Sequence, residues 1–147
     1  MLKKSITKDL IDLNVDASNW EDAIKNGANL LKEEGYISDE YITQIIDNVH
    51  ENGPYIVIAP GIALAHASAD GTVYKNGVSI ITLKKPVEFS HEQNDPVNLI
   101  ITFAAIDADE HLTTIQDIVT LLDDSEFMGL TQKSEDKEEL YKYIMKL

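Results

Sequence analysis

Histidine is the side chain best equipped for chemistry in this sequence, because the chain has four histidines, no cysteine and no arginine. His66 lies among small alanine side chains, in the run 63–67, which would leave its imidazole accessible to a large partner. His111 lies in the first turn of an expected helix capped by Asp107 or Asp109, where free backbone N–H groups bind anions. A nucleophilic histidine needs a neutral ring, an orienting partner and donors for incoming phosphoryl oxygens. His66 and the helix start at His111 are candidates for these parts.

Each histidine also has a purely structural interpretation. His66 fits a strand-end histidine bonded to the backbone, and His111 fits a solvated residue at a helix start. His91 lies in the polar run 90–95, which is typical of an exposed loop. His50 ends an expected helix, where a cation favours the helix dipole, or else it reaches the pocket of His66. The local sequence leaves these alternatives open.

Other catalytic motifs are absent from the sequence. It has no G-x-S-x-G nucleophile elbow, no Walker-type or dinucleotide-binding glycine loop and no H-E-x-x-H pair. A zinc site built from His66, His111 and an acidic residue lacks the compact ligand spacing of such sites. We therefore expect no metal and no cofactor, with a metal-dependent hydrolase as a remote alternative.

The amino-acid composition limits which partners the protein could bind and where in the cell it could be found. The length of 147 residues is typical of one domain, and the formal charge of −14 argues against nucleic acid or an anionic membrane surface. Since all twelve basic residues are lysine, an anion site must work without a guanidinium group. The absence of cysteine, of a signal-peptide pattern and of a long apolar run favours a cytoplasmic protein without direct membrane insertion.

The elements that must position the histidines are readable from periodicity. Helices are expected from the capping-box run Ser18–Glu21 to Gly35, from Ser38 to Gly53, from Asp107 with Leu112, Ile115, Ile118, Val119 and Leu122 on its inner face, and from about Ser134. Strands are expected at 55–59, 62–67, 78–83 and 97–103. This order predicts one α/β domain over 1–147, a sandwich with a mixed central β-sheet flanked by helices.

The run Gly53–Ala67 closely resembles the active-site segment of enzyme IIA components of the bacterial sugar phosphotransferase system. The resemblance is to the mannitol/fructose class and, within it, to the ascorbate-like branch. It covers roughly residues 10 to 145, and its further matching blocks are Gly77–Ser79, Leu83–Val87, Asn94–Val97 and His111-Leu112.

This resemblance implies a phosphotransferase with a phosphohistidine intermediate. His66 would accept a phosphoryl group from the phosphocarrier HPr and pass it to a cysteine of enzyme IIB, for uptake of an ascorbate-like or pentitol-like sugar through the permease, enzyme IIC. The residue matching His111 lies beside the active histidine and helps to hold the phosphoryl group. A regulatory protein, whose phosphorylation state controls a partner, is the alternative.

Two positions depart from the family pattern. Ala65 stands where a proline commonly precedes the active histidine, and the arginine that commonly follows it is absent, with Ser68 in that region. We therefore expect the phosphoryl oxygens to be held near Ser68, by the His111 helix start and by backbone N–H groups between Ile62 and His66. The backbone residues concerned are Ile62, Ala63 and Ala65, and the lysines considered as additional donors are Lys75, Lys84 and Lys85.

Overall fold

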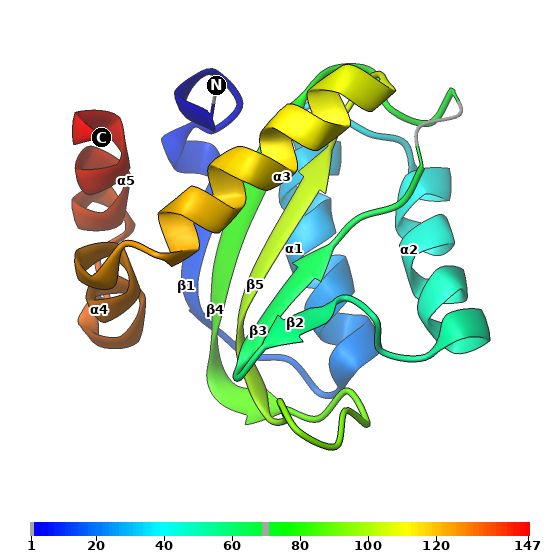
Figure 1. Cartoon of the computed structure of the whole chain (residues 1–147), viewed down its shortest axis with the longest axis horizontal. Coiled ribbons are helices and arrows are strands. Elements are labelled where there is room, and N and C mark those ends of the chain that lie inside the picture. Colours follow the sequence, from blue (N-terminus) through cyan, green and yellow to red (C-terminus); the bar gives the residue numbers. More distant parts are fainter. Residues whose placement is uncertain (1, 69–70) are drawn as a thin grey trace.

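A mixed β-sheet forms the centre of the computed structural model, which describes residues 2–68 and 71–147 (Figure 1). Its strand order is β1-β4-β5-β3-β2. The strands are β1 (Ile11–Val15), β2 (Val57–Ala59), β3 (Ile62–Ala65), β4 (Gly77–Val87) and β5 (Val97–Ala104). Because β3 and β5 are parallel, their carboxyl ends reach the same edge of the sheet. The segment after β3, which carries His66, therefore meets the segment after β5.

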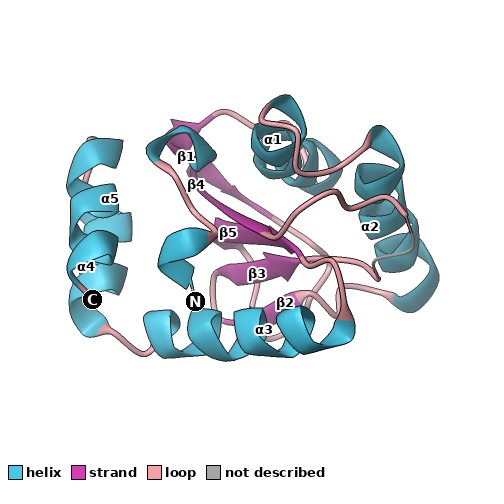
Figure 2. Cartoon of the chain, turned by 90° about the horizontal axis from the view of Figure 1, so that it is seen from above, coloured by secondary structure: helices cyan, strands magenta, loops and turns pink. Residues whose placement is uncertain are grey.

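Helices cover both faces of this sheet. They are α1 (Trp20–Glu33), α2 (Asp39–Asn52), α3 (Ala108–Leu122), α4 (Ser125–Lys133) and α5 (Lys137–Lys146). Figure 2 shows α1 and α3 on opposite sides of the sheet, with α4 and α5 beyond β1. The central strands β4 and β5 are almost continuously buried, as expected for strands with helices on both faces. The predicted mixed sheet flanked by helices is confirmed.

Two elements were missed in the sequence. β1 precedes α1 and pairs in parallel with β4, whereas the expected order began with a helix. Its residues alternate between buried and more exposed positions, the pattern of a short edge strand. The helix expected from Ser134 begins at Lys137, and α4 lies before it, with the Asp124 side chain accepting a hydrogen bond from the backbone N–H of Phe127.

Element ends also differ from the expected ones. Of the strand expected at 55–59, only the last three residues form a strand, which is β2. The strand expected at 62–67 ends at Ala65, and the strand expected at 78–83 extends to Val87. The first helix is capped by Asn19, whose side chain accepts from the N–H of Asp22, so the expected capping box at Ser18 is displaced by one residue.

The buried face of α3 agrees only in part with the expected one: Ile118 is buried, and Ile115 and Leu122 are partly buried against the core. Thr114, Ile118 and Leu121 are its buried residues. Leu112 and Val119, which were expected to face the core, are 58% and 46% exposed. An apolar stripe of α3 therefore remains on the surface, starting in the turn that holds His111.

Candidate active site

His66 follows directly on the last residue of β3, at the carboxyl edge of the sheet. Its ring is half-buried and stacks on Phe103 of β5, with 4.9 Å between the centroids and 17° between the planes. The ring of Tyr55 meets it edge-on, with a centroid distance of 6.2 Å. These contacts fix the plane of the imidazole while leaving part of it exposed.

Only one tautomer of the His66 ring satisfies its hydrogen bond. Nδ1 lies 2.9 Å from the carbonyl oxygen of Leu64, and a carbonyl oxygen accepts but does not donate. Nδ1 therefore carries the hydrogen, and the lone pair of the neutral ring is on Nε2. This is the orienting partner that a nucleophilic imidazole requires.

His111 lies in the first turn of α3, next to His66. The two ring centroids are 5.4 Å apart, and His111 is 5.1 Å from the ring of Phe103, so Phe103 contacts both imidazoles. The side chain of Asp107 caps the helix by accepting from the backbone N–H of Glu110 at 2.8 Å. The first intrahelical bond of α3 runs from the N–H of His111 to the carbonyl of Asp107, so the N–H groups of Ala108 and Asp109 have no acceptor within the helix and can donate to an anion.

A cavity of about 300 Å³ opens between these segments. Its lining residues are Ser68, Ala105, Asp107, Ala108 and His111. It thus joins the chain just after His66 to the start of α3. A hydroxyl group, an imidazole and a helix N-terminus around one cavity can hold a tetrahedral anion without any arginine.

Burial lowers the pKa of His66 below its ordinary value of 6.5, and the neighbouring His111 acts in the same direction, against the hydrogen bond to Leu64. The ring should therefore be neutral at pH 7, and its ability to accept an electrophile should fall only when the pH drops through the lowered pKa. Between that pKa and 6.5 the unfolded chain binds a proton that the folded chain does not, so the free energy of unfolding should decrease as pH falls. An NMR titration of the His66 ring measures this, and a pKa above 6.5 would contradict it.

The structure does not bring all the candidate residues together. Ile62, Ala63 and Ala65 are buried in β3, in register with Leu99, Ile100 and Thr102 of β5. Their amides lie within the sheet, which argues against their predicted contact with phosphoryl oxygens. Ser68 is exposed and lines the cavity, as its predicted role requires.

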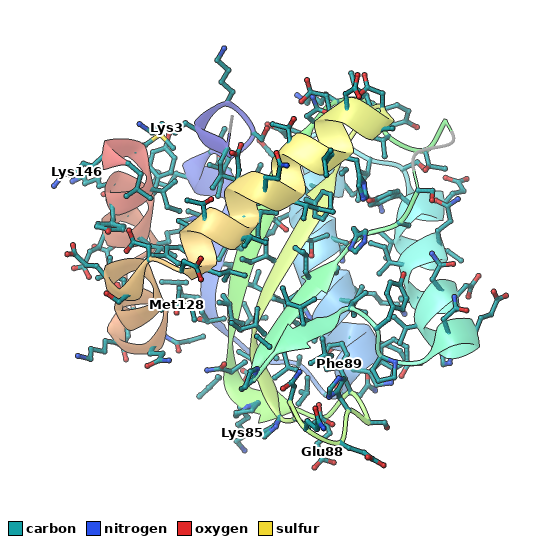
Figure 3. All side chains as sticks on the ribbon, in the orientation of Figure 1. Lys3, Lys85, Glu88, Phe89, Met128 and Lys146 are labelled. Carbon is teal, nitrogen blue, oxygen red and sulfur yellow. The ribbon has the colours of Figure 1, made fainter. Side chains whose placement is uncertain are left out.

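The lysines considered as donors lie elsewhere. Gly77 of β4 pairs with Ala104 at the His66 edge, whereas Val87 pairs with Val97, so Lys84 and Lys85 lie towards the opposite edge. Figure 3 shows Lys85 at the end of the sheet away from the start of α3. The Lys75 ammonium lies 4.3 Å from the centre of the Tyr36 ring. These placements argue against Lys84 and Lys85 as phosphoryl ligands.

The two remaining histidines have partners of their own. His50 Nε2 is 3.4 Å from a carboxylate oxygen of Glu21, and its ring packs against Trp20. His91 Nδ1 accepts from the backbone N–H groups of Gln93 and Asn94 within the loop. Both follow their structural interpretations. Among residues 2–68 and 71–147, no group of three or more His, Cys, Asp or Glu side chains could hold a metal ion, and no helix there could span a membrane.

Phe103 and Tyr41 are the residues that sequence reasoning missed. Phe103 was expected to be an ordinary strand residue, yet its ring contacts both imidazoles. Its role is visible only in the sheet, where it lies near the carboxyl end of the strand that pairs with the one preceding His66. Nothing in the sequence singles out Tyr41, whose buried hydroxyl bonds the backbone of Ala67 and Phe103.

A histidine oriented by a backbone carbonyl beside a helix N-terminus, at the carboxyl edge of a mixed sheet, is an arrangement suited to phosphoryl transfer. The chain belongs to the family of the phosphoenolpyruvate-dependent sugar phosphotransferase system, EIIA 2, whose model matches residues 4–147. It is accordingly a phosphotransferase component of the enzyme IIA type.

Individual relatives support this assignment. The chain is 44% identical to the ascorbate-specific phosphotransferase system EIIA component of Escherichia coli K12 over 117 residues, 79% of this chain and 76% of the relative. The mannitol-specific cryptic phosphotransferase enzyme IIA CmtB from Escherichia coli has a TM-score of 0.87 and 30% identity over 100% of both chains. Enzyme IIA for mannitol, from a complex with phosphorylated enzyme IIB of Escherichia coli, has a TM-score of 0.78 and 26% identity over 95% of this chain and 98% of that one.

Proposed function

We propose that Nε2 of His66 accepts a phosphoryl group from phosphorylated HPr and passes it to a cysteine of enzyme IIB. The observation that carries this proposal is the bond from Nδ1 of His66 to Leu64, which leaves Nε2 as the nucleophilic nitrogen of a neutral ring. The N–P bond to Nε2 forms as the donor's bond to phosphorus breaks, with the electron pair leaving on the donor. In the second step a cysteine sulfur attacks phosphorus, and the N–P electron pair returns to Nε2.

The phosphorylated ring keeps its hydrogen on Nδ1 and therefore carries a positive charge, which the Leu64 carbonyl oxygen stabilises. The charge on the phosphoryl oxygens is held by the side chain of His111, the hydroxyl of Ser68 and the N–H groups at the start of α3. Since attack and departure are in line, positioning and charge stabilisation supply most of the catalysis.

The proposed transport system takes up an ascorbate-like or pentitol-like sugar. Support comes from the 44% identity to the ascorbate-specific component of Escherichia coli K12. The sugar itself does not contact this chain in the scheme, because the phosphoryl group travels through enzyme IIB and is used at the permease, enzyme IIC. A cytoplasmic location is part of the proposal and agrees with a chain that has no cysteine.

An apolar rim around the site suits the docking of these protein partners. Tyr55, Ile106 and Leu112 are 44%, 50% and 58% exposed. Ile106 and Leu112 belong to the segment that lines the cavity and carries His111, and the ring of Tyr55 meets that of His66 edge-on. Exposed apolar side chains surrounded by polar ones are typical of protein interaction sites. The formal charge of −14 favours partners with a positively charged face.

Leu112→Asp is therefore expected to weaken phosphoryl transfer from HPr about 10-fold, by loss of apolar contact and added charge, with the fold unchanged. The measurement is the rate of phosphorylation at several concentrations of phosphorylated HPr, in which the half-saturating concentration should rise. Leu147→Asp is the matched control, since Leu147 is another exposed leucine, at the C-terminal end of the chain. Equal effects of the two changes would argue against the rim.

Labelling tests the function as a whole. The chain is incubated with phosphoenolpyruvate, enzyme I and HPr, and the expected product is an acid-labile phosphohistidine that disappears when enzyme IIB of an ascorbate-type system is added. Absence of any labelling would refute the proposal. Labelling without onward transfer to enzyme IIB would instead favour a protein whose phosphorylation state controls a partner.

A further inference from the structure

A buried tyrosine hydroxyl lies directly behind the candidate site. Tyr41, in the first turn of α2, is fully buried. Its hydroxyl accepts a hydrogen bond from the backbone N–H of Ala67 at 3.0 Å and lies 2.8 Å from the carbonyl oxygen of Phe103 and 3.1 Å from that of Ala67. The hydroxyl has one proton, and the shorter distance assigns it to Phe103. Tyr41 thus connects the residue after His66 to the residue whose ring contacts both imidazoles.

The register of β3 and β5 shows which backbone hydrogen bond the Tyr41 hydroxyl replaces. Leu64 donates its N–H to Ile56, on the side of the strand away from β5. Backbone N–H groups alternate between the two sides of a strand, so Ala65 and Ala67 direct theirs towards β5. Ala65 is in register with Thr102, and in a parallel ladder the next bond would join the N–H of Ala67 to the carbonyl of Phe103.

The Tyr41 hydroxyl occupies the position of that bond. Where the ladder would place one N–H···O=C contact, the structure has two successive bonds, from Ala67 to the hydroxyl and from the hydroxyl to Phe103. A direct bond spans roughly 2.9 Å between nitrogen and oxygen, so inserting an oxygen atom separates the two strand ends while keeping every polar group paired. The separation occurs at His66, between the last ladder residue and Ala67.

We propose that Tyr41 is a positioning residue for phosphoryl transfer: its hydroxyl sets the spacing of the strand ends that carry His66 and Phe103. Its hydroxyl bonds the backbone of Ala67 and Phe103, so it acts on the site through the main chain. This inference rests on the proposed role of His66 and adds a residue of α2 to the machinery of the site.

The hydroxyl is suited to a fixed structural task. Burial raises the pKa of Tyr41 to about 12, against the opposing effect of the hydrogen bond with Ala67. The hydroxyl consequently stays protonated and donates to Phe103 over the whole pH range in which the protein would work. Without it, the N–H of Ala67 and the carbonyl of Phe103 would have to close on each other or remain unpaired in the protein interior.

Tyr41→Phe tests this inference, because it removes the hydroxyl and keeps the ring. Phosphorylation of His66 in a single turnover is expected to slow by on the order of 10-fold to 100-fold, with the half-saturating concentration of phosphorylated HPr unchanged, since misplacing a reacting group has effects of this size. Tyr143→Phe is the matched control: the Tyr143 hydroxyl bonds both carboxylate oxygens of Asp124 at 2.7 and 2.8 Å, and it lies in α5, away from the site. Tyr143→Phe also removes a hydrogen-bonded tyrosine hydroxyl and should keep the wild-type rate.

A second readout does not depend on phosphorylation. The nitrogen chemical shifts of the His66 ring report its tautomer and its bond to Leu64, and they should change in Tyr41→Phe but not in Tyr143→Phe. Unchanged ring shifts in Tyr41→Phe, or a wild-type rate, would overturn the positioning role. If the wild-type chain accepts no phosphoryl group, the proposed function fails, and the ring shifts still decide the role of Tyr41.

A measurement on the wild-type chain covers the case in which Tyr41→Phe does not fold. Hydrogen exchange of the Ala67 amide should be slow, similar to that of Ala65 inside the ladder, because the Tyr41 hydroxyl accepts its hydrogen bond. Exchange as fast as that of an exposed loop amide would overturn the inference.

Discussion

His66→Ala is expected to abolish phosphorylation by HPr. The substitution removes the only imidazole whose nitrogen is both oriented by a backbone carbonyl and placed at the cavity edge of the sheet, among residues 2–68 and 71–147. His111 is not expected to substitute for it, because it lies in the first turn of α3 and, in the part of the chain that the structure describes, no backbone carbonyl accepts a hydrogen bond from its ring as that of Leu64 does from His66. Covalent labelling should therefore fall below detection rather than decrease in rate.

The measurement is incorporation of labelled phosphate from phosphoenolpyruvate through enzyme I and HPr, with acid lability as the signature of a phosphohistidine. His50→Ala is a suitable control, since it also removes an imidazole, at the end of α2, where the ring pairs with Glu21. It should be labelled at the wild-type rate. Full labelling of His66→Ala would assign the phosphoryl group to another residue and end the proposal.

His111→Ala is expected to slow phosphoryl transfer by about 10²-fold to 10³-fold, the usual cost of removing one donor from a developing anion. The imidazole is 5.4 Å from that of His66 between ring centroids, close enough for His111 to donate to an oxygen of a phosphoryl group on Nε2. Because the side chain is half-buried at the start of a helix, its removal should leave thermal unfolding nearly unchanged. The observable is the single-turnover rate of phosphorylation.

His111→Gln is the companion variant. Its amide can donate one hydrogen bond from a similar position, so it should recover part of the rate lost in His111→Ala. If both variants react at the wild-type rate, the donor role of His111 is refuted. If both lose the rate and also unfold at lower temperature, the contribution of His111 is to the packing around Phe103.

The fold class was predictable because the central strands are apolar runs of strand length between helices of clear 3.6-residue period. β1 was not predictable from the same signal, since its five residues Ile-Asp-Leu-Asn-Val are half polar and include Asn14 in a left-handed conformation, with φ of 56°. Its place in the sheet depends on parallel pairing with β4, more than sixty residues later in the chain. Pairing between segments so far apart in the chain produces no pattern in the sequence of either segment alone.

The α3 helix shows a different limit. Leu112, Ile115, Ile118, Val119 and Leu122 have helical spacing, and that spacing indicates an apolar face without saying what covers it. The structure turns Ile118 inward and leaves Leu112 and Val119 on the surface. An apolar helix face that binds a partner protein and one that packs against the core have the same sequence period. Only the structure distinguishes the two.

The two histidines were found from residue type and local context, whereas their supporting residues were not. Phe103 and Tyr41 are an aromatic strand residue and an aromatic helix residue, types that usually serve the core. Both act at the end of the sheet. The ring of Phe103 contacts both imidazoles, and the hydroxyl of Tyr41 takes the place of one hydrogen bond between β3 and β5. Such roles arise from tertiary register, which a single sequence does not display.

Because β3 pairs in parallel with β5, His66 can accept a phosphoryl group only after the sheet has formed. His66 and Phe103 come from strands that are separated in the chain by the whole of β4, so a copy in which β3 and β5 have not paired lacks the site. A phosphoryl donor would thus label native molecules and leave misfolded ones unlabelled. The stoichiometry of labelling in a preparation would count its correctly folded fraction.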